Sequence, residues 1–78
     1  MNKKEFNEIK DQYIHETLVD VYNALDEKGY NALSQIVGFL FSDDPTYITP
    51  YKDARKKIEA IDRDELMEHI LKGYFNFK

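Results

Sequence analysis

The segment between Asn31 and Pro45 constrains the fold most, because it is too apolar for a helix with only one buried face. At about 100° per residue its apolar side chains cover roughly 200° of a helix surface; they are Ala32, Leu33, Ile36, Val37, Phe39, Leu40 and Phe41. Asn31 is a good N-cap, and the residue before Pro45 disfavours helical backbone, so a helix is predicted from about 32 to 41. We expect it to be the central, nearly enclosed element.

A second helix is predicted upstream, over residues 14–28. Its apolar residues follow helical spacing, and Lys28-Gly29 supplies a cation and then a glycine at the end; these residues are Leu18, Val21, Tyr22 and Leu25. Residues 1–13 show no recognisable cap. We therefore expect an N-terminal arm over 1–13, which could be helical when it docks, and a single helical domain over 14–78.

Downstream, two prolines and a pair of carboxylates mark further helix starts. Asp44-Pro45 and Thr49-Pro50 each place a capping residue before proline, and the second pair is predicted to begin a helix that continues to about residue 62. Asp62 and Glu65 have the spacing of a capping box for the last helix. The sequence thus predicts an all-α fold, a compact bundle of about five short helices.

The chain has 78 residues, no cysteine and a formal charge of −4. So short a chain buries only about 60% of its unfolded surface, which makes a second copy a plausible source of further burial. We expect a homodimer, with helix two and the aromatic C-terminal end as candidates for the seam; the residues singled out are Phe39, Phe41, Tyr74, Phe75 and Phe77. No apolar run approaches the roughly 20 residues that cross a bilayer, so membrane insertion and secretion are not expected and a cytoplasmic location is.

No residue pattern predicts catalysis or a cofactor. The three glycines are isolated from one another, so no phosphate-binding loop is present, and no catalytic, cofactor-binding or metal-binding residues are assigned. Glu65 and His69 are an i, i+4 pair that could hold half a metal site, but a solvated helix pair is the ordinary interpretation. We expect a protein that is not an enzyme.

Charge is uneven along the chain. Residues 51–63 hold five basic side chains against three acidic ones on an acidic protein. The simplest interpretation is a solvated helix surface; the functional one is a face for an acidic or phosphorylated partner, for which we select Lys52, Asp53, Arg55, Arg63, Asp64 and Glu65. An alternative function is a small helical nucleic-acid-binding module that uses residues 52–63, which the net charge of −4 disfavours.

Five blocks in order resemble the IreB family of small regulatory phosphoproteins, which includes ReoM-type regulators of Gram-positive bacteria. They are VYNALDEKGYN from Val21, QIVGFL from Gln35, DPTYI from Asp44, KDAR from Lys52 and RDEL from Arg63. The resemblance spans about residues 17–74. It implies a compact five-helix, homodimeric, cytoplasmic protein without enzymatic activity that binds other bacterial regulatory proteins.

The resemblance also implies a pathway. In that family a transmembrane Ser/Thr kinase with PASTA repeats phosphorylates the N-terminal arm, and this controls peptidoglycan precursor synthesis. ReoM-type members do so through Clp-protease turnover of the enzyme that commits UDP-N-acetylglucosamine to the cell wall. Here residues 1–16 contain neither Ser nor Thr, and Thr17 is the first such residue. We therefore assign no phosphosite and do not expect the family's control through the arm.

Overall fold

The computed structural model describes residues 3–76, with their side chains except those of residues 3, 4, 6 and 7. It contains four α-helices, α1 (Lys3–Glu27), α2 (Ala32–Ser42), α3 (Ala54–Glu59) and α4 (Arg63–Tyr74). Two 3₁₀ turns, η1 (Pro45–Tyr47) and η2 (Tyr51–Asp53), connect α2 to α3. Residues 3–76 include no strand, so the predicted all-α class is confirmed. The helix count differs from about five, because two of the short segments are 3₁₀ turns.

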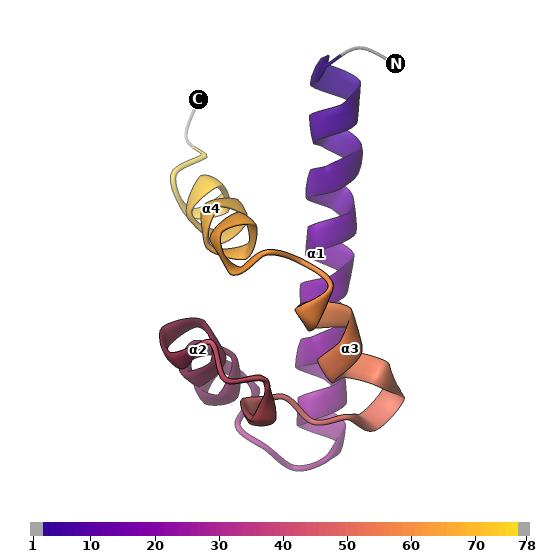
Figure 1. The fold of residues 1–78 in the computed structure, drawn as a ribbon, viewed down its shortest axis with the longest axis vertical. Helices are drawn as coiled ribbons and strands as arrows, with labels where there is room; N and C mark the ends of the chain where they lie inside the picture. Colours follow the sequence, from indigo (N-terminus) through magenta and orange to yellow (C-terminus); the bar gives the residue numbers. More distant parts are fainter. Residues whose placement is uncertain (1–2, 77–78) are drawn as a thin grey trace.

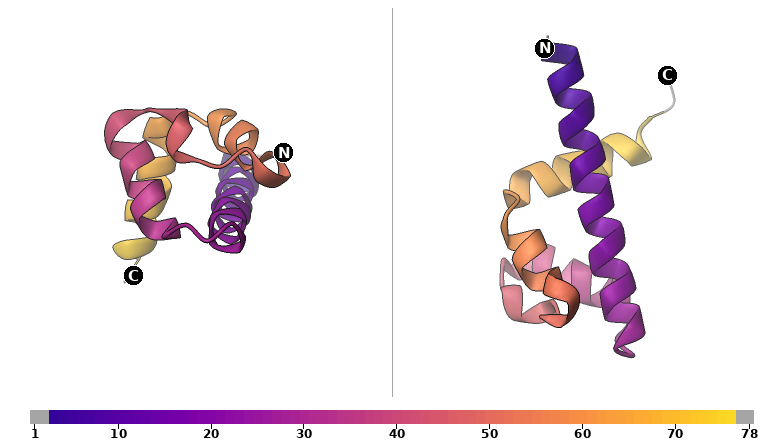
Figure 2. Two further views of the ribbon diagram at one scale, coloured as in Figure 1. Left: turned by 90° about the horizontal axis from the view of Figure 1, so that it is seen from below. Right: turned by 90° about the vertical axis from the view of Figure 1, so that its right-hand side faces the viewer.

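The central element is α1, not the apolar helix α2 as predicted. Figure 1 shows α1 running the length of the molecule, with α2 and α4 on one side of it, and Figure 2 shows α4 crossing it steeply. α1 contacts α2, α3 and α4. Only Ala32 and Phe39 of α2 are buried, so much of its wide apolar surface faces outward in the single chain.

The predicted boundary near residue 14 is also wrong for the helix itself, because α1 already begins at Lys3. The part of the predicted arm that the structure describes is therefore the first part of α1. The C-terminal end of α1 was predicted correctly. Gly29 has φ 84°, and the amides of Gly29 and Tyr30 donate to the carbonyls of Asp26 and Leu25, which is the Schellman arrangement that ends a helix.

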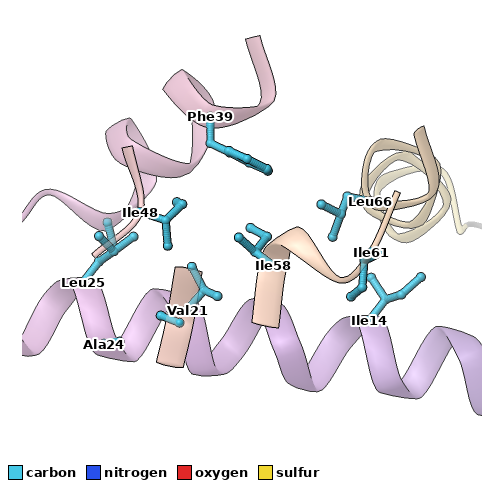
Figure 3. Packing of buried hydrophobic residues seen from close by; sticks show 11 residues of the cluster. Ile14, Val21, Ala24, Leu25, Phe39, Ile48, Ile58, Ile61 and Leu66 are labelled. Carbon is cyan, nitrogen blue, oxygen red and sulfur yellow. The ribbon is translucent and has the colours of Figure 1, made fainter. Parts of the chain in front are cut away.

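The core lies along one face of α1 (Figure 3). Near the start of α4, Ile14 of α1 approaches Ile61 and Leu66. Nearer the end of α1, the side chains of Val21 and Leu25 point toward the part of the core that lies under α2. The buried residues are Ile14, Val21, Ala24, Leu25, Ala32, Phe39, Ile48, Ala54, Ile58, Ile61 and Leu66. Burial of such side chains is the main stabilising contribution to a fold of this kind.

Local capping explains where α2 begins and how the chain turns after it. The Asn31 side chain accepts a hydrogen bond from the Ser34 amide, as predicted for an N-cap. Asp44 caps η1 by accepting from the Thr46 amide, with Pro45 in the first turn. These two predicted helix starts are confirmed.

The helix predicted from Thr49-Pro50 onward is interrupted. Lys52 and Asp53 both have positive φ, 52° and 61°, which separates η2 from α3. Left-handed backbone is uncommon for residues other than glycine. Neither of these two positions is a glycine, so the sequence carried no signal for this break. None of the helices in residues 3–76 combines the length and the apolar character needed to cross a bilayer.

Candidate functional surface

The most distinctive surface is an apolar stripe on α2. Leu33, Val37 and Phe41, at i, i+4 and i+8, are 66%, 63% and 89% exposed; we call these three residues the α2 stripe. Residues four apart share one face of a helix, so the three side chains form a continuous row. A contiguous exposed apolar row is typical of an interaction surface.

α4 and the residues after it expose further apolar groups. The helix α4 itself lies on the same side of α1 as α2 (Figure 1). The exposed apolar residues are Met67, Ile70, Leu71, Tyr74 and Phe75. Of the residues proposed for a dimer seam, Phe41, Tyr74 and Phe75 are thus at the surface. Phe39 is only 3% exposed and belongs to the core of the single chain, and Phe77 lies outside the described residues.

The predicted partner-binding face does not form one free cluster. Lys52 pairs with Glu27 of α1 at 3.1 Å between Nζ and Oε2, and Glu65 pairs with Lys10 at 2.8 Å. Asp53 and Asp64 are exposed. Two of the six residues chosen from the sequence therefore link their own segments to α1.

The two arginines of that face hold backbone carbonyl groups. Arg55 Nε donates to the Ile48 carbonyl at 2.9 Å, and Arg63 Nη1 donates to the Leu40 carbonyl at 3.3 Å. Leu40 lies in the last turn of α2, where carbonyls lack partners within the helix, so Arg63 caps α2 from the start of α4. Both arginines therefore hold backbone carbonyls of their own chain.

The predicted capping box at α4 is wrong. Asp62 occupies the N-cap position but its side chain makes no capping hydrogen bond. Glu65 does not reach back to it, because the Glu65 carboxylate accepts from Lys10 of α1 instead. The tertiary ion pair has replaced the local one.

A second polar pair joins the same two helices. His69 Nδ1 lies 3.6 Å from Asp11 Oδ1, and the His69 ring is 6.2 Å from that of His15 between centroids. Within residues 3–76 no three His, Cys, Asp or Glu side chains are placed to hold a metal ion. Glu65 and His69 thus have their partners on α1: Lys10 and Asp11.

Among the residues whose side chains the structure describes, three surface groups have displaced pKa values. The hydrogen bond from Lys10 to Glu65 raises the pKa of Lys10, and the hydrogen bond to Glu27 raises that of Lys52. The pKa of Asp44 is lowered, first because the Thr46 hydroxyl donates to it and then because the Thr46 amide does. All three shifts follow from structural contacts, so they do not indicate a catalytic group.

The exposure of Leu33 and Val37 is the feature that sequence reasoning missed. Helix two and Phe41 were predicted as candidates for a dimer seam, but the wide apolar arc was also expected to make this helix nearly enclosed. The α2 stripe belongs to a chain that, as a whole, matches a known protein family along almost its entire length. The model of the family described as IreB regulatory phosphoprotein matches residues 2–76, which confirms the resemblance drawn from the five sequence blocks, and the chain belongs to the IreB family.

Proposed function

We propose that this chain is a non-enzymatic cytoplasmic regulator that works by binding proteins, first a second copy of itself and then a regulatory partner. Membership of a family of regulatory phosphoproteins supports the regulatory role. The observation that carries the binding mode is the α2 stripe, since three large apolar side chains in a row are more exposed than a single folded domain requires. A two-fold dimer would cover the same stripe on both copies.

The proposed partner face is the surface around Arg55 and Arg63. Each guanidinium uses one nitrogen for its backbone carbonyl, and no further hydrogen bond of either group is present within residues 3–76. The remaining N–H groups have the geometry to bind a carboxylate or phosphate of a partner. Asp53 and Asp64 lie on the same segment and would contribute polar contacts.

In the proposed pathway the regulator acts on peptidoglycan precursor synthesis, in the manner of IreB and ReoM proteins. A Ser/Thr kinase, and Clp protease or its substrate, are the proposed partners. Because residues 1–16 contain no Ser or Thr, we do not propose control through the arm.

The nucleic-acid alternative finds little support in the surface charges. Lys52 and Lys57 pair with Glu27 and Asp20 of α1. Phosphate binding depends on cations that are free to replace counterions. A protein-binding role therefore fits the segment better.

A deletion strain tests the regulatory role. UDP-linked peptidoglycan precursors are measured in cells lacking the gene and in cells complemented with the wild-type chain, Val37→Glu or Ile9→Glu. Ile9 is an exposed apolar residue of α1, so Ile9→Glu controls for the added charge. We expect the deletion to change the pools, and wild type and Ile9→Glu to restore them where Val37→Glu does not. Unchanged pools in the deletion strain would contradict the proposed pathway.

A further inference from the structure

We propose that the apolar face of α4 is a docking site for a basic amphipathic helix of another protein. The face is formed by four residues, which we call the α4 face: Met67, Ile70, Leu71 and Tyr74. It is a different surface from the α2 stripe, and the inference goes beyond the proposed function and does not depend on it. The observation behind it is that α4 turns a polar edge, and not its apolar face, toward α1.

Polar side chains hold α4 to α1, which it crosses steeply (Figure 2). Glu65 Oε1 accepts a hydrogen bond from Lys10 Nζ at 2.8 Å. His69 Nδ1 lies 3.6 Å from Asp11 Oδ1. Glu65 and His69 are four residues apart, so both lie on one edge of α4. Leu66 is the only buried residue of α4, a helix that the structure describes in full.

The α4 face points away from this polar edge. Its members stand at i, i+3, i+4 and i+7, which is the spacing of one helix face. Met67 is two positions from both Glu65 and His69, so it lies about half a turn around the helix from them. The exposed fraction of the α4 face rises from 39% at Met67 to 79% at Tyr74. An amphipathic helix normally turns such a face to the core, but here the single chain leaves it open.

The aromatic end of α4 extends the α4 face. The rings of Tyr74 and Phe75 pack edge to face, with their centroids 4.9 Å apart. Both residues are exposed. Large aromatic rings supply much of the contact energy in protein interfaces, so this end is suited to anchor a partner.

Carboxylates line one edge of the α4 face. Asp64 and Glu68 precede Leu71 by seven and three residues, which places them beside it on the helix surface. Both carboxylates are exposed. Lys72 Nζ lies 3.7 Å from Glu68 Oε1, but an exposed pair of this kind is weak and gives way to a partner at little cost.

The N-terminal end of the α4 face adjoins an acidic hollow of about 590 Å³ around the first turn of the helix. The acidic residues that line it are Asp43, Glu59, Asp62, Asp64 and Glu65. Arg63 lines it too, but its guanidinium already donates to the Leu40 carbonyl. An apolar row bordered by carboxylates matches a partner helix that carries an apolar row with lysines or arginines beside it.

Charge also argues against a second copy of this chain as the occupant. Its other exposed apolar helix, α2, contains no charged residue and is followed by Asp43 and Asp44. Docked on α4, it would bring carboxylates toward carboxylates. An anionic membrane surface would be repelled in the same way. A separate protein with a basic amphipathic helix satisfies both the apolar face and its acidic border.

Photo-crosslinking in the cells that produce the chain tests the occupant. The variant Leu71→benzoylphenylalanine places the crosslinker in the α4 face, and Val19→benzoylphenylalanine, at an exposed apolar position of α1, is the control. Position 71 should crosslink to a peptide of another protein that has helical apolar spacing with lysine or arginine beside it, and position 19 should not. A crosslink from position 71 to a second copy, to a segment without that pattern, or to nothing would overturn the proposal.

The same crosslink in a chain that also carries Val37→Glu separates this proposal from the proposed dimer. It should persist, because the α4 face lies within one chain and needs no second copy. If the wild-type chain is a monomer, the dimer fails while the crosslink from position 71 still decides the α4 face. Loss of the crosslink in the Val37→Glu chain would place the contact in the dimer and overturn the α4 face as an independent site.

A synthetic peptide of the crosslinked segment tests the role of charge, by titration into the whole chain with fluorescence anisotropy. Asp64→Asn combined with Glu68→Gln should weaken binding by about tenfold at low salt and flatten its salt dependence. Glu16→Gln combined with Asp26→Asn removes the same charge from exposed positions of α1 and should change binding little. Circular dichroism checks that both chains are folded. Equal losses in the two chains would show unspecific attraction to an acidic protein and overturn the site.

Discussion

The ring of Tyr47 lies directly against the backbone of Gly38. A Cβ atom on Gly38 would come within 2.5 Å of Tyr47 Cε1. The Tyr47 carbonyl also accepts a hydrogen bond from Gln35 Nε2 at 2.9 Å. The glycine in the middle of α2 thus allows η1 to fold back onto the helix.

This contact predicts that Gly38→Ala changes the free energy of unfolding in opposite directions with and without the Tyr47 ring. Gly38→Ala should gain about 1 kcal/mol from helix propensity but lose about 1–3 kcal/mol from displacing the ring, so we expect it to destabilise the wild-type chain. In a Tyr47→Ala background the same substitution should stabilise by about 0.5–1 kcal/mol. Urea unfolding of the four chains measures both effects. A stabilising Gly38→Ala in the presence of Tyr47 would show that the ring moves aside without cost.

Replacing Arg55 or Arg63 by alanine is expected to lower the stability of the fold as well as the binding of a partner. Arg63→Ala leaves the Leu40 carbonyl without its partner, and Arg55→Ala does the same to Ile48. We expect each to lower the free energy of unfolding by about 1–3 kcal/mol. Thermal melts measure this, with Lys56→Ala as a control, since Lys56 is exposed on the same helix as Arg55. Melting temperatures equal to wild type for both arginine variants would mean that the carbonyl bonds contribute nothing.

The two N-cap positions should respond differently. Asn31→Ala removes a capping hydrogen bond to Ser34 and should cost about 0.5–2 kcal/mol. Asp62→Ala removes no such bond, so its effect should stay within about 0.5 kcal/mol. Chemical denaturation of both variants compares them. A larger loss for Asp62→Ala than for Asn31→Ala would restore the capping box.

The lowered pKa of Asp44 predicts that the turn it caps, η1, loses stability at low pH. Its pKa is lowered by the Thr46 hydroxyl and amide, so its contribution is present above the ordinary carboxyl pKa and is lost as pH falls through the lowered value. Thr46→Val removes the larger cause and should raise the pKa of Asp44 toward, but not to, its ordinary value, since the amide remains. NMR titration of the Asp44 carboxyl group in both chains measures the shift. An unchanged pKa in Thr46→Val would assign the effect to the backbone alone.

Short signals in the sequence predicted the helix starts and ends that interactions between neighbouring residues determine. Asn31, Asp44-Pro45 and Gly29 mark the start of α2, the start of η1 and the end of α1, and each acts through neighbouring backbone groups. The family resemblance was likewise visible in the order of five short blocks. The all-α class followed from these features together.

Tertiary contacts decided the rest. The first turns of α1 have no strong apolar pattern of their own, and farther along the helix Lys10, Asp11 and Ile14 approach α4. Glu65 could have bonded locally but pairs with Lys10 instead. The wide apolar arc of α2 was compatible with burial in its own chain or against another, and periodicity does not distinguish these two outcomes.

Sedimentation equilibrium at micromolar concentration tests the central claim most directly. The wild-type chain and Ile9→Glu should each show twice the 9.3 kDa mass of one chain. Val37→Glu, which places a charge in the middle of the α2 stripe, should show a folded single chain, because an unpaired charge is costly to bury in an apolar interface. A wild-type monomer, or a dimer that Val37→Glu leaves intact, would contradict association through the α2 stripe.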